Sequence, residues 1–111
     1  MVQLMIDQPN IIYNKTGISS SFNSDVYYTD RWTHVAIQLD VANQSAANFS
    51  AVAQVSIDGI GWANYGTAQT ITADGTYAFN VVELGFSKLR FAVTITAGSA
   101  DFKIQTQGKQ G

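Results

Sequence analysis

The sequence has 111 residues, of which six are basic and eight acidic, so the net charge is −2. This length corresponds to one domain, and the hydrophobic content of 46% excludes a disordered chain. The absence of cysteine excludes disulfides, a thiol nucleophile and a thiolate metal site, and the charge balance offers no cationic surface for nucleic acid.

The first residues differ in pattern from the rest. We expect residues 1–9 to form an N-terminal arm, with one β domain over residues 10–111. The arm lacks the basic region of a secretory signal, and Pro9 stops it from being a central strand. Its apolar side chains, which we expect to bind a partner surface, are Val2, Leu4, Met5 and Ile6. No segment has the run of about 18 to 20 apolar residues that a membrane helix needs, so we expect no membrane partner.

Short strands are expected next, at Ile11–Tyr13 and Val26–Tyr28, with a loop between them. From residue 34 onward, apolar side chains recur at every second position, which is the period of a strand with one buried face. The runs with this alternation are His34–Ala42, Phe49–Ile57, Thr76–Glu83, Lys88–Thr96 and Asp101–Gln107.

Turn-forming residues separate these runs. Asp58-Gly59 and Asp74-Gly75 supply the positive φ that tight turns require. We expect Gln44–Asn48 to link the first two long strands and Ala97–Ala100 to form a hairpin between the last two. The pattern predicts an all-β fold, a single antiparallel β-sandwich of jelly-roll-like form with about eight strands.

Catalytic chemistry has little support. His34 is the only histidine, and no G-x-S-x-G motif accompanies it. Asp58 and Asp74 precede glycine, as turn formers do, and a glycosidase pair would need Glu83, the only glutamate. A loop calcium site at 23–25 with Asp30 is an alternative. Otherwise we expect no enzyme, no cofactor and no metal site.

The faces that alternate with the core are nearly uncharged. Opposite the buried positions, 34–42 presents Ala36 and Gln38 with one charge, Asp40, and 49–57 presents small neutral residues including Val52 and Gln54. A free monomer normally carries charge on such faces, whereas interface cores are depleted of it. This favours a subunit of an assembly, although coverage of both faces by the second sheet and by loops is the alternative.

Three segments carry a resemblance to a known group. They are Val55–Trp62 (VSIDGIGW), Thr70–Tyr77 (TITADGTY) and Leu84–Thr94 (LGFSKLRFAVT), with Ala97–Ala100 closing the pattern. The region from Trp32 to Gln107 resembles small tailed-bacteriophage virion β-sandwich proteins of the capsid decoration, or cement, type. The resemblance implies a structural virion protein on the capsid surface, a homotrimer, that binds and stabilises the joints between major capsid proteins.

Two readings remain open for the binding residues. For the cement role we expect the partner to contact the arm residues together with Val52, Gln54, Lys88 and Arg90. The alternative is a tail or fibre component, or a carbohydrate-binding (receptor-binding) module in which Trp32, Trp62 and Tyr65 stack on a glycan.

Overall fold

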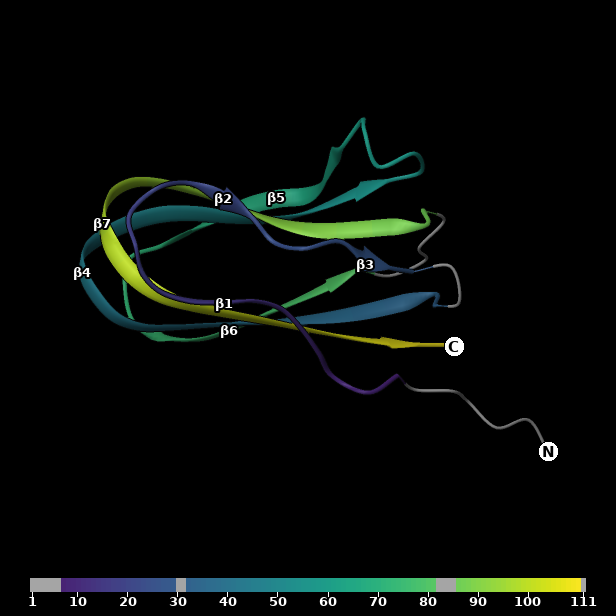
Figure 1. Ribbon diagram of the computed structural model, residues 1–111, viewed down its shortest axis with the longest axis horizontal. Coiled ribbons are helices and arrows are strands. Elements are labelled where there is room, and N and C mark those ends of the chain that lie inside the picture. Colours follow the sequence, from purple (N-terminus) through teal and green to yellow (C-terminus); the bar gives the residue numbers. More distant parts are fainter. Residues whose placement is uncertain (1–6, 30–31, 82–85, 111) are drawn as a thin grey trace.

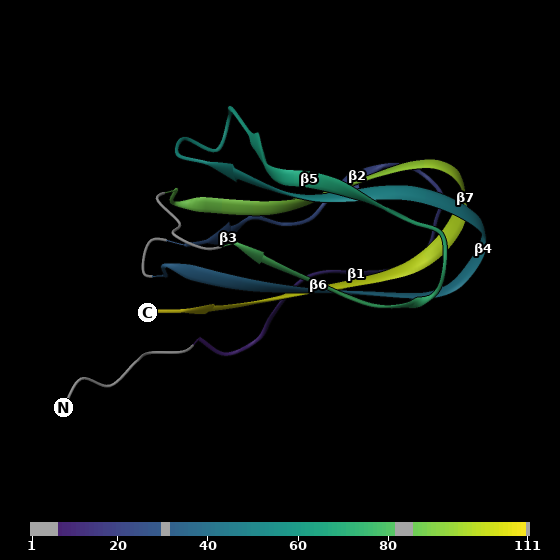
Figure 2. The same ribbon diagram turned by 180° about the vertical axis from the view of Figure 1, so that it is seen from behind.

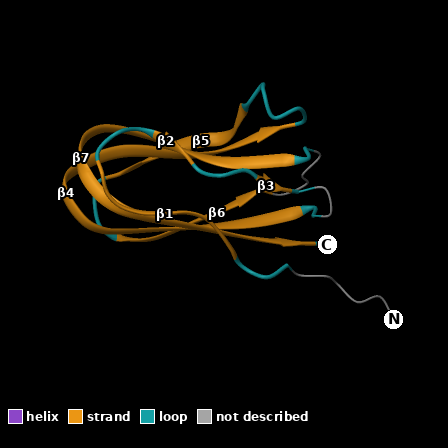
Figure 3. Cartoon of the chain, viewed as in Figure 1, coloured by secondary structure: helices purple, strands orange, loops and turns teal. Residues whose placement is uncertain are grey.

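The computed structural model describes residues 7–29, 32–81 and 86–110. In these residues the chain is all-β and antiparallel, as predicted, and contains no helix (Figure 3). The strands are β1 (Asn10–Ile18), β2 (Phe22–Asn23), β3 (Tyr27–Tyr28), β4 (His34–Ser56), β5 (Ala63–Ile71), β6 (Gly75–Val81) and β7 (Lys88–Lys109).

Two long strands make the frame of the fold. β4 and β7 pair antiparallel from His34 with Lys109 to Ser56 with Lys88, and both bend midway. One continuous sheet therefore folds over into the two layers of the expected sandwich, as Figures 1 and 2 show from opposite sides. Layer A contains the first half of β4 and the second half of β7, flanked by β6 and β1. Layer B contains the second half of β4 and the first half of β7, flanked by β5 and by β2 and β3.

The two ends of the molecule differ. At the closed end, residues 43–48 of β4 and 96–99 of β7 carry the bend from one layer to the other. At the open end lie the end of β7, the described start of the chain and the turn after β4 (Figure 1).

Two predictions about the residues of the bend are wrong. The linker expected at Gln44–Asn48 lies inside β4, and the hairpin expected at Ala97–Ala100 is wrong, because this segment lies inside β7. A hairpin would pair the two halves of β7 with each other, but each half pairs with β4 instead. Register shifts and left-handed backbone at Asn43, Ala46 and Gly98 let both strands turn together.

The core lies between the layers and confirms the period of two. Its aliphatic residues include Val35, Ile37, Leu39, Val41, Val55, Leu89, Val93 and Ile104, all buried. Aromatic rings join the layers: Phe102 meets Phe49 edge-on at 5.0 Å between centroids, and Phe79 meets Phe91 at 4.8 Å. Such pairs contribute about 0.5 to 1.5 kcal/mol beyond the area that they bury.

Candidate interaction surface

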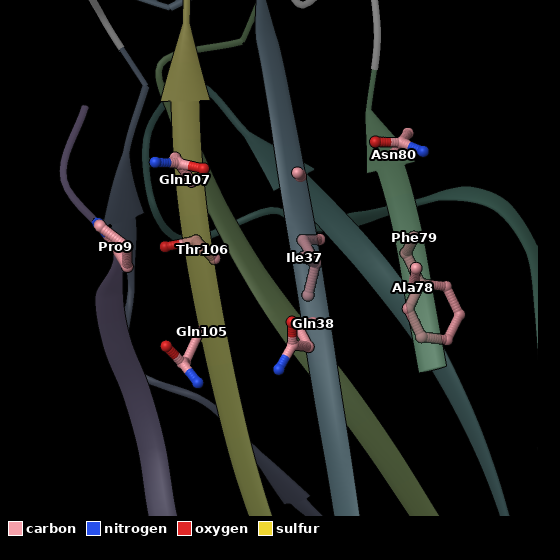
Figure 4. Close-up of a pocket in the computed structure, with 10 residues that line it drawn as sticks. Pro9, Ile37, Gln38, Ala78, Phe79, Asn80, Gln105, Thr106 and Gln107 are labelled. Atoms are coloured by element: carbon pink, nitrogen blue, oxygen red, sulfur yellow. The ribbon is translucent and has the colours of Figure 1, made fainter. Parts of the chain in front are cut away.

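The outer face of layer A carries the uncharged surface that the sequence predicts. β4, β6 and β7 contribute alternate residues that turn away from the core, and they surround a shallow hollow of about 210 Å³ (Figure 4). We call this surface the amide face; it consists of Ala36, Gln38, Ala78, Asn80, Gln105 and Gln107. All but the half-buried Gln105 are exposed, and no charged side chain lines the hollow among the described residues.

Strand register explains why these neutral side chains gather. Gln38 pairs with Gln105 on one side and with Ala78 on the other, so small and amide residues lie in rows across the sheet. Charge begins one row closer to the bend, where Asp40 pairs with Lys103. There the Asp40 carboxylate accepts a hydrogen bond of 2.7 Å from the Thr76 hydroxyl.

The outer face of layer B is covered by its own side chains instead. Val52 is only 8% exposed, so it offers little surface to a partner. The Arg90 guanidinium lies 4.4 Å from the Trp62 ring centroid, and its Nε donates to Gln54 Oε1 at 2.8 Å. Gln54 in turn donates to the Asn64 side chain at 2.9 Å. Two residues predicted to bind a partner, Gln54 and Arg90, thus bind each other.

Lys88, also predicted to bind a partner, is held at the open end. Its ammonium donates to the Ile57 carbonyl at 2.9 Å and lies 5.8 Å from the centroid of the Tyr28 ring. The cation therefore satisfies a backbone acceptor of the turn after β4 while lying against an exposed aromatic ring.

The three aromatic residues proposed for glycan stacking are not brought together. Trp32 and Tyr65 pack against the core cluster between the layers. Trp62 lies beside Arg90, and its indole nitrogen donates to the Gly59 carbonyl at 3.2 Å. No shared stacking platform results from this arrangement.

The predicted arm residues Val2, Leu4, Met5 and Ile6 lie outside the described residues. The point from which they extend is well defined, because Asp7 is fixed to the end of β7. Its backbone N–H donates to the Gly108 carbonyl at 2.7 Å, and its carbonyl accepts from the Gln107 side chain at 2.9 Å.

The Asp7 side chain adds a second anchor. Its carboxylate accepts a hydrogen bond of 2.5 Å from the Tyr27 hydroxyl, whose oxygen in turn accepts from the Gly108 N–H at 3.1 Å. Burial, followed by this hydrogen bond and the negative charge of Asp7, raises the pKa of Tyr27. The start of the described chain is therefore held at the margin of the amide face.

Exposed apolar side chains at the open end were not predicted. We call this set the tip; it consists of Tyr28, Ile57, Ile60 and Phe86, and Ile60 is 86% exposed. The Asp58 carboxylate holds the turn by accepting from the N–H groups of Ile60 and Gly61, at 2.8 and 3.0 Å. These hydrogen bonds lower the pKa of Asp58. An isoleucine on each side of Asp58-Gly59 was the available signal for the tip.

No cluster of metal-binding side chains is assembled in the described ranges. No group of three or more histidine, aspartate or glutamate side chains could hold a metal ion there. The His34 ring lies 3.0 Å from the neighbouring Thr33 hydroxyl. Glu83 and Asp30, considered for hydrolysis and for calcium, lie outside those ranges. Over the same ranges, no helix has the length and apolar character needed to cross a membrane.

Comparison with known proteins identifies the fold. No protein-family model matches the sequence, and no curated protein matches it either. Among solved structures, the SPBc2 prophage-derived protein YomS is similar, with a TM-score of 0.66 at 5% identity, over 99% of this chain and 97% of that one. A structure described as Bacillus endospore appendages that form a novel family of disulfide-linked pili has a TM-score of 0.51 at 12% identity, over 99% and 93%.

Proposed function

We propose that this chain is a non-enzymatic structural subunit of a virion, and specifically a decoration protein on the outer shell of a phage capsid. The observation that carries the proposal is the amide face, an exposed sheet surface whose hollow is lined without charge. Such a surface is suited to close contact with another protein, because no ionised group must lose its water on binding.

The comparisons support an assembly role. One similar fold comes from a prophage and another from an appendage described as disulfide-linked pili. This chain has no cysteine, so covalent linkage of that kind is not available to it. Many weak non-covalent contacts repeated across a symmetric shell would give strong overall attachment without disulfides.

The experiment is localisation on particles. Particles released from the producing culture are labelled with an antibody against this chain and imaged by electron microscopy. Label over the capsid is the expected result. Label on tails, fibres or cell-attached filaments would contradict the decoration role, and no label on any ordered particle would overturn the structural role as well.

A variant pair tests the surface. Gln38→Glu with Gln105→Glu places two charges on the amide face and should reduce the amount of chain that co-sediments with particles at least tenfold. Ser19→Glu with Ser20→Glu adds the same charge on exposed positions of the loop between β1 and β2 and should co-sediment like the wild type. Equal retention of both double variants would contradict the assignment of this face.

A further inference from the structure

The outer edge of β6 lacks the features that normally stop a sheet edge from pairing with another chain. β6 pairs with β4 over its whole length, from Val81 with Val35 to Gly75 with Val41, with no register shift. In the described part of the chain, nothing pairs with its other side. The strand contains no charged residue and no proline. Because hydrogen bonds of alternate residues point to opposite sides of a strand, every second residue of β6 directs its N–H and C=O outward.

The other edge strands, β1, β2, β3 and β5, have such features. β1 has two register shifts and carries Lys15, and β2 and β3 are two residues long. β5 is interrupted by a register shift, with Gly66 in the left-handed region at φ 83°. Bulges, short length and lysine are the devices that stop an edge from pairing with another chain. β6 has none of them.

We propose that β6 pairs with β6 of a second copy of this chain, antiparallel about a twofold axis at Ala78. The sequence of the strand is complementary to itself in this register. Ala78 meets the partner's Ala78, where small side chains let the strands approach. Thr76 meets the partner's Asn80 on the outer face, and Tyr77 meets the partner's Phe79 on the inner face.

The inner-face pair supplies the driving force. Tyr77 and Phe79 are half-buried at the sheet edge, and Phe79 already packs against Phe91 of the core. Pairing would cover both rings and place two aromatic pairs across the interface, with no like charges opposed. Layer A then becomes one sheet running through both copies, and the two amide faces meet along the neutral row of Gln38, Ala78 and Gln105.

This inference rests on the proposed function: the dimer is the form in which the subunit would present its amide face to the particle. A closed twofold pair makes a dimer, not the trimer that the resemblance implies. A chain that is monomeric yet decorates particles would overturn the inference alone. A dimer absent from every particle would overturn the proposed function alone.

Cysteine substitution tests the geometry, because the sequence has no cysteine of its own. Residues opposed in an antiparallel ladder have Cα atoms about 4.5 to 5.5 Å apart, which a disulfide can span. Ala78→Cys, oxidised with glutathione disulfide, should run as a covalent dimer on a non-reducing gel. Gln38→Cys, on the same face but in the central strand β4, should remain monomeric. Equal cross-linking of the two variants would overturn the proposed register.

Charge substitution tests the association without a covalent bond. Wild-type mass by light scattering should be twice the 12.0 kDa of the chain, and Ala78→Lys should halve it. Mixing Ala78→Lys with Ala78→Glu should restore the doubled mass, while Ala36→Lys, a matched change on β4, should stay dimeric. A monomeric wild type, or a dimer that survives Ala78→Lys, would overturn the proposal.

Discussion

The closed and open ends of the molecule are built by different means. At the closed end, the backbones of β4 and β7 touch: a Cβ on Gly98 would lie 2.2 Å from the Ser45 carbonyl oxygen. Asp101 fixes the same region, because its carboxylate accepts from the Gly17 N–H and from the Asn43 side chain, each at 2.8 Å. The open end instead exposes the tip side chains.

The difference shows where backbone conformation determines the fold and where side chains are exposed without contributing to it. The bend depends on backbone conformations that few residues adopt, so changes there should cost folding free energy. Ile60 at the tip makes little contact with the rest of the chain, so changes there should leave folding intact. Four substitutions, from the largest expected effect to the smallest, test this contrast.

Gly98→Ala should destabilise the protein most. Gly98 has φ 73°, and the added methyl would overlap backbone atoms of Ser45 and Ala46, which cannot rotate away. Strain and overpacking together should lower the free energy of unfolding by about 3 to 5 kcal/mol, measured by urea denaturation. Gly17→Ala is the control: it shares a positive φ of 62° but has open space, so about 1 to 2 kcal/mol is expected. Equal losses would refute the close contact at the bend.

Gly108→Ala makes the same chemical change at the open end. Its Cβ would lie 2.4 Å from Cγ of Trp32, but Gly108 has no left-handed φ, and the neighbour is a half-buried side chain and not backbone. We expect a loss of about 1 to 3 kcal/mol by the same denaturation assay, together with a change in Trp32 fluorescence. A loss larger than that of Gly98→Ala would reverse the contrast between the ends.

Acid should weaken the closed end through Asp101. Hydrogen bonds from Asn43 and Gly17 lower the pKa of Asp101 from its usual value, so the folded state favours the carboxylate. This contribution is fully present above the unfolded pKa and is lost as pH falls through the folded one. Asp101→Asn should therefore reduce the fall in thermal stability between pH 5 and about pH 2, followed by circular dichroism. An unchanged acid profile would show that these hydrogen bonds do not stabilise the bend.

Particular residues show how far the sequence predicts this fold. The period of two gives most of the buried residues of β4 and β7, such as Leu39 and Phe91, because alternate residues of a strand face the other layer. It also places Ile57 on the buried face, which is wrong, because β4 ends at Ser56 and Ile57 is 68% exposed. The same pattern cannot distinguish a hairpin at Ala97–Ala100 from a bend. Both use a flexible glycine, and only the pairing of β7 with β4 over both of its halves decides between them.

The alternation of residues also predicts part of the candidate interaction surface. Alternation identifies Ala36 and Gln38 as facing outward and neutral, and they are exposed. It also identifies Val52 as facing outward, yet Val52 is buried, because the coverage of a face depends on distant side chains. The contact of Arg90 with Trp62 joins β7 to the turn before β5 in this way, and the spacing of the two residues in the sequence gives no sign of it.

Ile60→Ser should have the smallest effect on folding. Ile60 is 86% exposed, and the turn that presents it is held by the Asp58 carboxylate and not by the isoleucine side chain. The free energy of unfolding should therefore change by less than about 0.5 kcal/mol, while retention on a hydrophobic-interaction column should fall. Asp58→Ala is the matched change, because it keeps Ile60 but removes the acceptor for two backbone N–H groups. A loss of stability in Ile60→Ser equal to that in Asp58→Ala would show that the tip packs within the fold, and the open end would then be built like the closed one.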